Sequence, residues 1–231
     1  MGTPDTKYQE VFDFLTTNTC DNLILNGDII DGRYLRYFPT RPTEQRKVIE
    51  YILNLGEENK VKITYLKGNH ERLRKNLLPI KINNIVFADE IIYQSGNKKY
   101  LICHGQQFDK KICCIMGIET ISFLGGLFLF RLNRKFNNRR INHGYTYFSL
   151  VGKIKRLAKK IALGGEKSFD EKIKNLLHKK QCDGLICGHL HKSADRYIGK
   201  YHYLNSGDRI ESLTALVETE NHEWKIIKYG K

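Results

Sequence analysis

Four short, largely apolar runs in this chain each lead into a glycine that stands beside an aspartate, an asparagine or a histidine. The runs at residues 23–25, 61–66, 100–102 and 184–187 are followed by Gly27-Asp28, Gly68-Asn69-His70-Glu71, Cys103-His104-Gly105 and Gly188-His189-Leu190-His191. Apolar runs of this length between turn residues are typical of buried strands. Because open α/β sheets bind ligands at the carboxyl ends of their strands, we expect these polar side chains to meet at one edge of a sheet.

The side chains that follow the four runs are of the kinds that bind metal ions. Carboxylate, amide and imidazole ligands together suit borderline ions such as manganese, iron and zinc. Each motif alone has an ordinary interpretation, since Gly-Asp is a common turn signal and a histidine such as His104 can simply end a strand. Four such motifs in one chain favour a metal site.

In this order the motifs resemble those of the calcineurin-like metallophosphoesterases, with Gly-Asp-Ile-Ile-Asp at 27–31 included. Within that superfamily the chain is similar to the UDP-2,3-diacylglucosamine pyrophosphohydrolases and their relatives, on the closing segments 203–208 and 211–218. The resemblance covers nearly the whole chain. It implies an α/β fold of the αββα type, two mixed sheets between helices, as a single domain over residues 1–231 with a helical cap inserted at 110–165.

The same resemblance implies a site with two divalent metal ions, manganese first, with iron or zinc as alternatives. The implied metal ligands are Asp28, Asn69, His104, His189 and His191. Asp28 would bridge the two ions, and His191 would bind the second ion. His70 would be the catalytic residue near the leaving-group oxygen, as a general acid or as a donor to the phosphoryl group. Asp31 and Glu71 would orient the ligands or His70.

One motif of the family, Asp-x-His on its first strand, does not occur before Asp28. In the family that motif supplies two ligands of the second ion. Because the motif is absent, we expect the family's first strand to be missing from the chain. We expect the reading frame upstream of Met1 to encode an apolar strand ending in Asp-x-His. We also expect the chain as written to hold at most one tightly bound ion.

Net charge and the region 110–165 point to an anionic partner. The formal net charge is +14. Between Thr120 and Gly165 there are ten Lys or Arg residues and no Asp or Glu, after an apolar run at 121–130. An apolar helix beside a basic one is typical of an element that lies on an anionic membrane surface. The alternative is an ordinary helical hairpin with a solvated basic face.

Individual side chains can be named for these contacts. Phe123, Leu127 and Phe130 can share one helix face toward lipid, with Arg134 and Lys135 at the headgroups. Near the metal motifs, Arg33 and Arg36 could grip a phosphate or a sugar, although a solvated basic loop is equally compatible with the pattern.

The remaining patterns predict conventional elements. Helices are expected at 4–18, from 42 to about 56, and at 168–180, the last beginning at a capping box from Ser168 to Glu171. Strands at 183–187, 194–198, 201–204, 212–218 and 223–228 are expected to form an antiparallel meander. Six cysteines without a Cys-x-x-Cys pair favour reduced thiols in the cytosol.

Three functions agree with these observations. The first is a pyrophosphohydrolase of lipid A synthesis that acts on a UDP-linked acylated sugar, in the cytoplasm and peripheral at the inner face of the membrane. The second is a nucleic-acid or general phosphodiesterase, which the basic charge allows. The third is an N-terminally truncated, metal-poor protein without activity.

Overall fold

A computed structural model of the chain describes residues 6–30, 43–57, 61–69, 71, 75–109, 135–137, 139–140, 142–143, 166–208 and 212–229. The chain divides into two compact units, one made of Met1–Gln106 with Ile173–Lys231 and the other of Gln107–Lys172. All the strands belong to the first unit. In the second unit, the rings of Phe108 and Phe169 meet edge to face with centroids 5.5 Å apart. No helix within the described residues is both long and apolar enough to cross a membrane.

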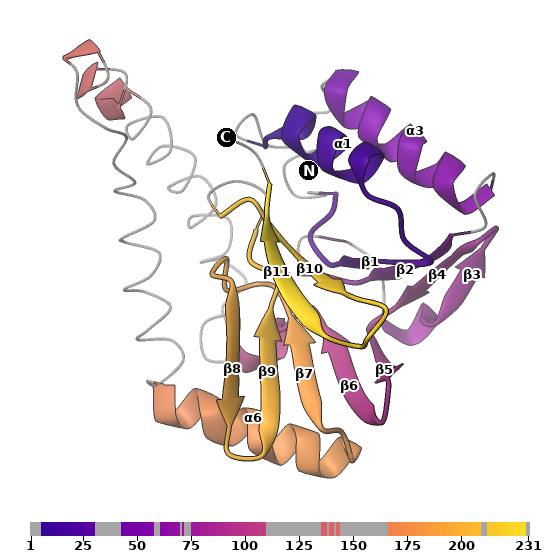
Figure 1. Cartoon of the computed structure of the whole chain (residues 1–231), viewed down its shortest axis with the longest axis vertical. Helices are drawn as coiled ribbons and strands as arrows, with labels where there is room; N and C mark the ends of the chain where they lie inside the picture. The colour runs from indigo at the N-terminus through magenta and orange to yellow at the C-terminus, as the bar shows by residue number, and fades with distance from the viewer. Residues whose placement is uncertain are drawn as a thin grey trace. The chain divides into compact units, whose positions relative to one another are not determined.

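The first sheet has the strand order β1-β2-β4-β3 and is parallel except for its edge strand β3 (Figure 1). Its members are β1 (Asn22–Asn26), β2 (Lys62–Leu66), β3 (Ile80–Ile82) and β4 (Ile85–Ala88). Helices α1 (Tyr8–Thr17) and α3 (Thr43–Glu57) cover one of its faces. Val48 and Ile52 lie one turn apart on α3 and pack with Ile63 and Tyr65 of β2, so helical and strand periodicities agree in this core.

The second sheet has the order β5-β6-β7-β9-β8. Its strands are β5 (Glu90–Ser95), β6 (Lys98–Cys103), β7 (Gly184–Cys187), β8 (Ala194–Ile198) and β9 (Tyr201–Asn205). The central strands β6, β7 and β9 run parallel to one another, and β7 is buried along its whole length. Strands covered on both faces read as continuous apolar runs, which is the pattern of residues 184–187. Helix α6 (Glu166–Lys180) enters the first unit at Ile173; Ile173 and Leu177 are fully buried there, and Lys180 contacts Glu90 of β5.

The two sheets share an apolar core. It contains the buried residues Leu66, Ala88, Tyr100, Ile102, Ile186 and Leu204, which come from both sheets. The hairpin of β10 (Thr214–Glu218) and β11 (Trp224–Lys228) adds Leu216 and Trp224 to it. Helices outside and two mixed sheets inside make the layers αββα, so the predicted fold class is confirmed.

Two expectations about the last third of the chain are wrong. The strands from 183 to 228 do not form an antiparallel meander: β7 pairs with β9 in parallel, β8 takes the edge, and β10 with β11 forms a separate two-stranded sheet. Periodicity locates strands but does not say which strands pair. Helix α6 begins at Glu166, before the predicted cap Ser168. Helix ends vary by a residue or two because the first turn lacks internal hydrogen bonds.

Candidate metal centre

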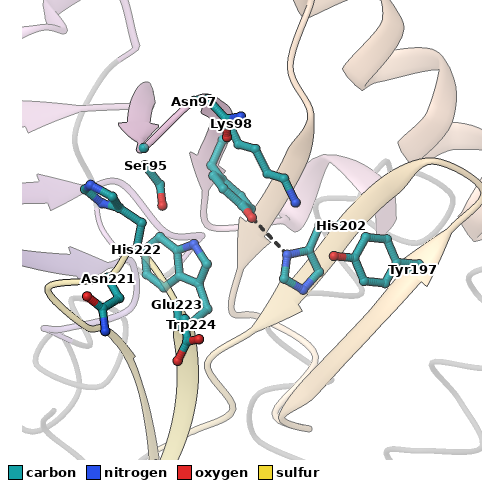
Figure 2. Close-up of a pocket in the computed structure, with 11 residues that line it drawn as sticks. Ser95, Asn97, Lys98, Tyr197, His202, Asn221, His222, Glu223 and Trp224 are labelled. Carbon is teal, nitrogen blue, oxygen red and sulfur yellow. Dashed lines mark hydrogen bonds between the residues drawn. The ribbon is translucent and has the colours of Figure 1, made fainter.

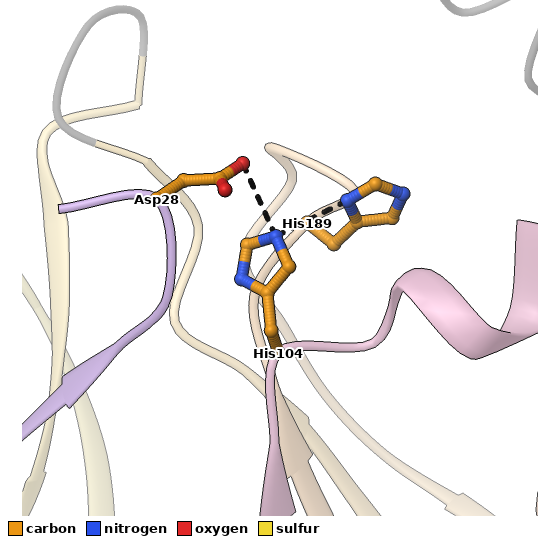
Figure 3. Close-up of side chains that lie close together, drawn as sticks. All are labelled: Asp28, His104 and His189. Atoms are coloured by element: carbon orange, nitrogen blue, oxygen red, sulfur yellow. Dashed lines mark hydrogen bonds and ion pairs between the residues drawn. The ribbon is translucent and has the colours of Figure 1, made fainter. Parts of the chain in front are cut away.

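The loops that follow β1, β2, β6 and β7 bring four of the predicted ligands together. The Nε2 atom of His104 lies 3.2 Å from Asp28 Oδ2, 3.3 Å from Asn69 Oδ1 and 3.3 Å from His189 Nδ1. Potential ligand atoms of Asp28, His104 and His189 all lie within 4.8 Å of one another (Figure 3). Four strands of the two sheets, β1, β2, β6 and β7, therefore end at one polar cluster.

The His104 ring has a defined protonation pattern. Its side chain is only 3% exposed, and its Nδ1 lies 2.9 Å from the backbone carbonyl of Asn26. A carbonyl can only accept, so Nδ1 carries the proton and donates it. In the neutral ring, Nε2 then presents a lone pair to the rest of the cluster. This arrangement, with one imidazole nitrogen tied to a carbonyl, is the one that orients metal-binding histidines.

The cluster fits a bound divalent cation. Around Nε2 stand the oxygens of Asp28 and Asn69, which accept hydrogen bonds, and a bound cation among these three atoms would offset their mutual repulsion. Ligands that each lie about 2.1 Å from one ion are separated by roughly 3.0–3.4 Å, depending on geometry. The observed separations of 3.2–3.3 Å match that range.

Several of these residues have an unusual backbone conformation. Asp28, His189 and His191 have φ values of 53°, 58° and 58°, in the left-handed region. A residue with a Cβ adopts this conformation at a cost of about 1 kcal/mol, and surrounding contacts must hold it there. For His189 those contacts involve Gly188, whose N–H donates to the His104 carbonyl and whose carbonyl accepts from Asn205 Nδ2.

Glu71 holds the loop that carries Asp28. Its Oε1 accepts from the backbone N–H groups of Ile29 and Ile30 and from the Tyr65 hydroxyl, and its Oε2 accepts from the N–H groups of Asp28 and Gly68. One carboxylate thereby joins the loops after β1 and β2. The resemblance implies that Glu71 orients ligands or His70, and in the structure Glu71 accepts hydrogen bonds from backbone N–H groups and one phenol.

Two glycines of the motifs are required by close approach. A Cβ on Gly27, which has a φ of 72°, would lie 2.3 Å from Nδ1 of His104. A Cβ on Gly68 would lie 2.1 Å from Oδ1 of Asp28. The glycine in front of each ligand therefore makes room for a ligand that arrives from another strand.

His191 stands outside the cluster formed by Asp28, His104 and His189. Its ring is 49% exposed, and its Nδ1 lies 3.0 Å from Oδ2 of Asp208. The other oxygen of Asp208 accepts from the N–H and hydroxyl groups of Ser212, so Asp208 both closes a turn and orients His191. The assignment of His191 to a second metal ion stays a prediction.

The remaining predicted site residues are placed as follows. Lys135 is exposed and belongs to the second unit. The others lie outside the described residues: His70, Asp31, Arg33, Arg36, Phe123, Leu127, Phe130 and Arg134.

Two contributors to the site were missed by sequence analysis. The Asn26 carbonyl that orients His104 is a backbone group, for which no side-chain pattern exists. Asn205 is fully buried and ties the loop after β7 to the end of β9. A buried-strand pattern that ends in asparagine, as in Tyr-Leu-Asn, could have drawn attention to it.

The sequence matches a known protein family. The sequence pattern of the family "calcineurin-like phosphoesterase" matches residues 5–193. No curated protein matches the chain. Among solved structures, the chain is similar to vacuolar protein sorting 29 from Cryptosporidium parvum, with 12% identity over 98% of this chain and 89% of the other and a TM-score of 0.46.

An archaeal phosphodiesterase gives 14% identity, coverage of 97% and 91%, and a TM-score of 0.43. A single mutant of Vps29 from Entamoeba histolytica is 11% identical over 97% of this chain and 92% of the other, with a TM-score of 0.44. The family match spans most of the chain and includes all four motifs up to His191. The chain therefore belongs to the calcineurin-like phosphoesterases, which are metal-dependent hydrolases of phosphoric esters.

Proposed function

We propose that this protein hydrolyses a pyrophosphate or phosphoester bond in an anionic, lipid-linked substrate of the UDP-2,3-diacylglucosamine type, at the cytoplasmic surface of a membrane. The observation that carries the hydrolytic part is the convergence of Asp28, Asn69, His104 and His189 around one point. Divalent ions at such a site polarise the phosphate and lower the pKa of a water nucleophile.

The residues of the chain prepare that chemistry. His104 is held with its Nε2 lone pair toward the cluster by the Asn26 carbonyl. Asp28 is placed by the left-handed backbone that Glu71 maintains. In this proposal His70, which stands between Asn69 and Glu71 in the sequence, acts on the leaving-group oxygen, as the family resemblance implies.

The lipid part of the proposal is supported by the sequence. A net charge of +14 favours an anionic partner. The apolar run at 121–130, followed by ten basic residues before Gly165, suits a surface that contacts both acyl chains and headgroups. A nuclease would have little use for that apolar run, which is why the lipid-linked substrate is preferred to nucleic acid.

Substrate preference tests the proposal directly. With Mn²⁺ present, the protein should hydrolyse UDP-2,3-diacylglucosamine more than about 100-fold faster in kcat/KM than UDP-N-acetylglucosamine, because each buried CH₂ of an acyl chain contributes about 0.8 kcal/mol. Product formation is measured by chromatography of the nucleotide and sugar-phosphate products. Single-stranded DNA serves as a third substrate. Equal rates on the two sugar nucleotides, or faster cleavage of the DNA, would contradict the lipid assignment.

Vesicle binding tests the membrane surface separately. Replacing Phe123, Leu127 and Phe130 together by Ser should reduce the affinity for vesicles of anionic phospholipid, measured by co-sedimentation, by about a thousandfold or more, since each apolar side chain that enters the lipid would contribute about 1.5–3 kcal/mol. Added salt should weaken binding further. The matched control replaces Leu77, Ile80 and Ile82, which are also exposed apolar residues, at 63%, 43% and 54%. A similar loss in both triple variants would show nonspecific adhesion.

A further inference from the structure

A row of aromatic side chains crosses the second sheet near the amino ends of its parallel strands, away from the metal ligands. Strand register pairs Tyr93 with Tyr100, Tyr100 with Gly184, Gly184 with His202, and His202 with Tyr197. Gly184 is the gap in this row, and a Cβ there would lie 2.5 Å from the Tyr100 ring. The glycine lets Tyr100 lie across β7 and reach His202 on the next strand.

Hydrogen bonds make this row rigid. The Tyr100 hydroxyl lies 2.9 Å from His202 Nδ1, and His202 Nε2 lies 2.8 Å from Asp195 Oδ1 (Figure 2 shows the first). Because the Asp195 carboxylate accepts, Nε2 donates to it and Nδ1 accepts the phenol proton. Burial raises the pKa of Tyr100 to about 12, so the phenol keeps that proton. The Tyr197 ring stacks on His202 at 4.7 Å with an angle of 7° between the ring planes.

A cavity of about 540 Å³ lies against this row. Its other walls are the turn between β5 and β6, with Ser95, Asn97 and Lys98, and the end of the β10–β11 turn, with Asn221 and Trp224 (Figure 2). The volume lies within the roughly 300–1,000 Å³ typical of small-ligand sites. All these residues belong to the first unit, so the cavity is built within one compact body.

Two groups at the cavity, Trp224 and Lys98, favour an oxygen-rich occupant with an anionic group, and Glu223 on the β10–β11 turn is the acidic residue of the lining. The Trp224 indole N–H is buried beside the Tyr100 hydroxyl, and no acceptor among the described residues meets it with hydrogen-bond geometry. Lys98 has no ion pair within the described part of the chain, and its side chain extends toward His202 in Figure 2. An ammonium group without a partner favours an anion. The polar atoms of Tyr100 and His202 already bond to each other. The groups that select a ligand must therefore lie on the β5–β6 and β10–β11 turns.

We propose that this cavity is a binding site for a phosphorylated monosaccharide, distinct from the metal centre and independent of the proposed function. The side-chain amides of Asn97 and Asn221 each donate and accept, as sugar hydroxyls do. The aromatic wall meets the C–H face of the sugar ring. The phosphate pairs with Lys98, and a ring or hydroxyl oxygen accepts from the Trp224 indole.

The chain offers its own reporter for this site, because Trp224 is the single tryptophan. Glucose 6-phosphate is titrated into the full chain in EDTA, so that metal-bound phosphate does not contribute, and Trp224 fluorescence is recorded. A saturable change is expected at millimolar concentrations or below. Glucose should bind roughly tenfold more weakly, because a hydrogen bond to a charged group contributes more than a neutral one.

Variants and a second probe decide the outcome. Lys98→Ala should weaken glucose 6-phosphate binding by about tenfold. Lys99→Ala is the matched control, since neighbouring strand residues face opposite sides of a sheet, and it should bind as the parent does. Asp28→Asn should also bind normally, which separates this site from the metal centre. No saturable change with glucose 6-phosphate, equal loss in both lysine variants, or equally tight binding of inorganic phosphate would overturn the proposal.

Discussion

Replacement of Asp28 by Asn is expected to abolish both metal binding and phosphoester hydrolysis. Asp28 supplies a carboxylate oxygen 3.2 Å from His104 Nε2 and is the residue that family resemblance places between two ions. Loss of a group that only orients a ligand weakens metal binding by roughly 10- to 100-fold, so loss of a charged ligand should exceed about 100-fold. Metal content by mass spectrometry of the purified protein and turnover of bis-p-nitrophenyl phosphate with Mn²⁺ measure the two effects.

Asp195→Asn is the control for this substitution. It removes the carboxylate of another aspartate–histidine pair, 2.8 Å from Nε2 of His202 and outside the cluster of Asp28, His104 and His189. That variant should keep its metal and its turnover. If Asp28→Asn retains both, Asp28 is not a ligand, and the cluster of Asp28, His104 and His189 is an ordinary hydrogen-bonded network.

Glu71→Gln is expected to destabilise the fold and to weaken metal binding together. The carboxylate accepts four backbone N–H groups and one hydroxyl, and a glutamine would turn an N–H₂ group toward several of those donors. The free energy of unfolding should fall by about 2 kcal/mol. In a protein of this size that lowers the melting temperature by roughly 4–8 °C. Metal affinity should fall by about 10-fold or more, because the Asp28 loop is no longer fixed.

Two further variants test whether the hydrogen bonds of Glu71 to the Asp28 loop explain the loss of stability and of metal affinity. Glu223→Gln removes the charge of an exposed glutamate and should leave both melting temperature and metal affinity unchanged. Tyr65→Phe removes only the hydroxyl that donates to Glu71, so it should reproduce a small part of the loss. Normal metal affinity in a destabilised Glu71→Gln protein would mean that Glu71 supports the fold without positioning Asp28.

The sequence by itself determined the elements and the chemistry of the motifs. The apolar runs before Gly27, Gly68, Gly105 and Gly188 became β1, β2, β6 and β7, because strand and turn preferences are local. The chemical types of the metal ligands could be predicted from the residue types alone. The αββα class followed from the resemblance that these motifs carry, and the family match confirms it.

Only the tertiary structure decided how those motifs meet. Pairing of β7 with β9 in parallel, against the expected meander, depends on contacts that periodicity does not encode. The groups around His104 come from residues 78, 35 and 85 positions away along the chain. The carbonyl of Asn26 and the N–H groups held by Glu71 are backbone atoms, identical in every residue type. Their roles arise from the folded geometry, since a side-chain pattern cannot mark them.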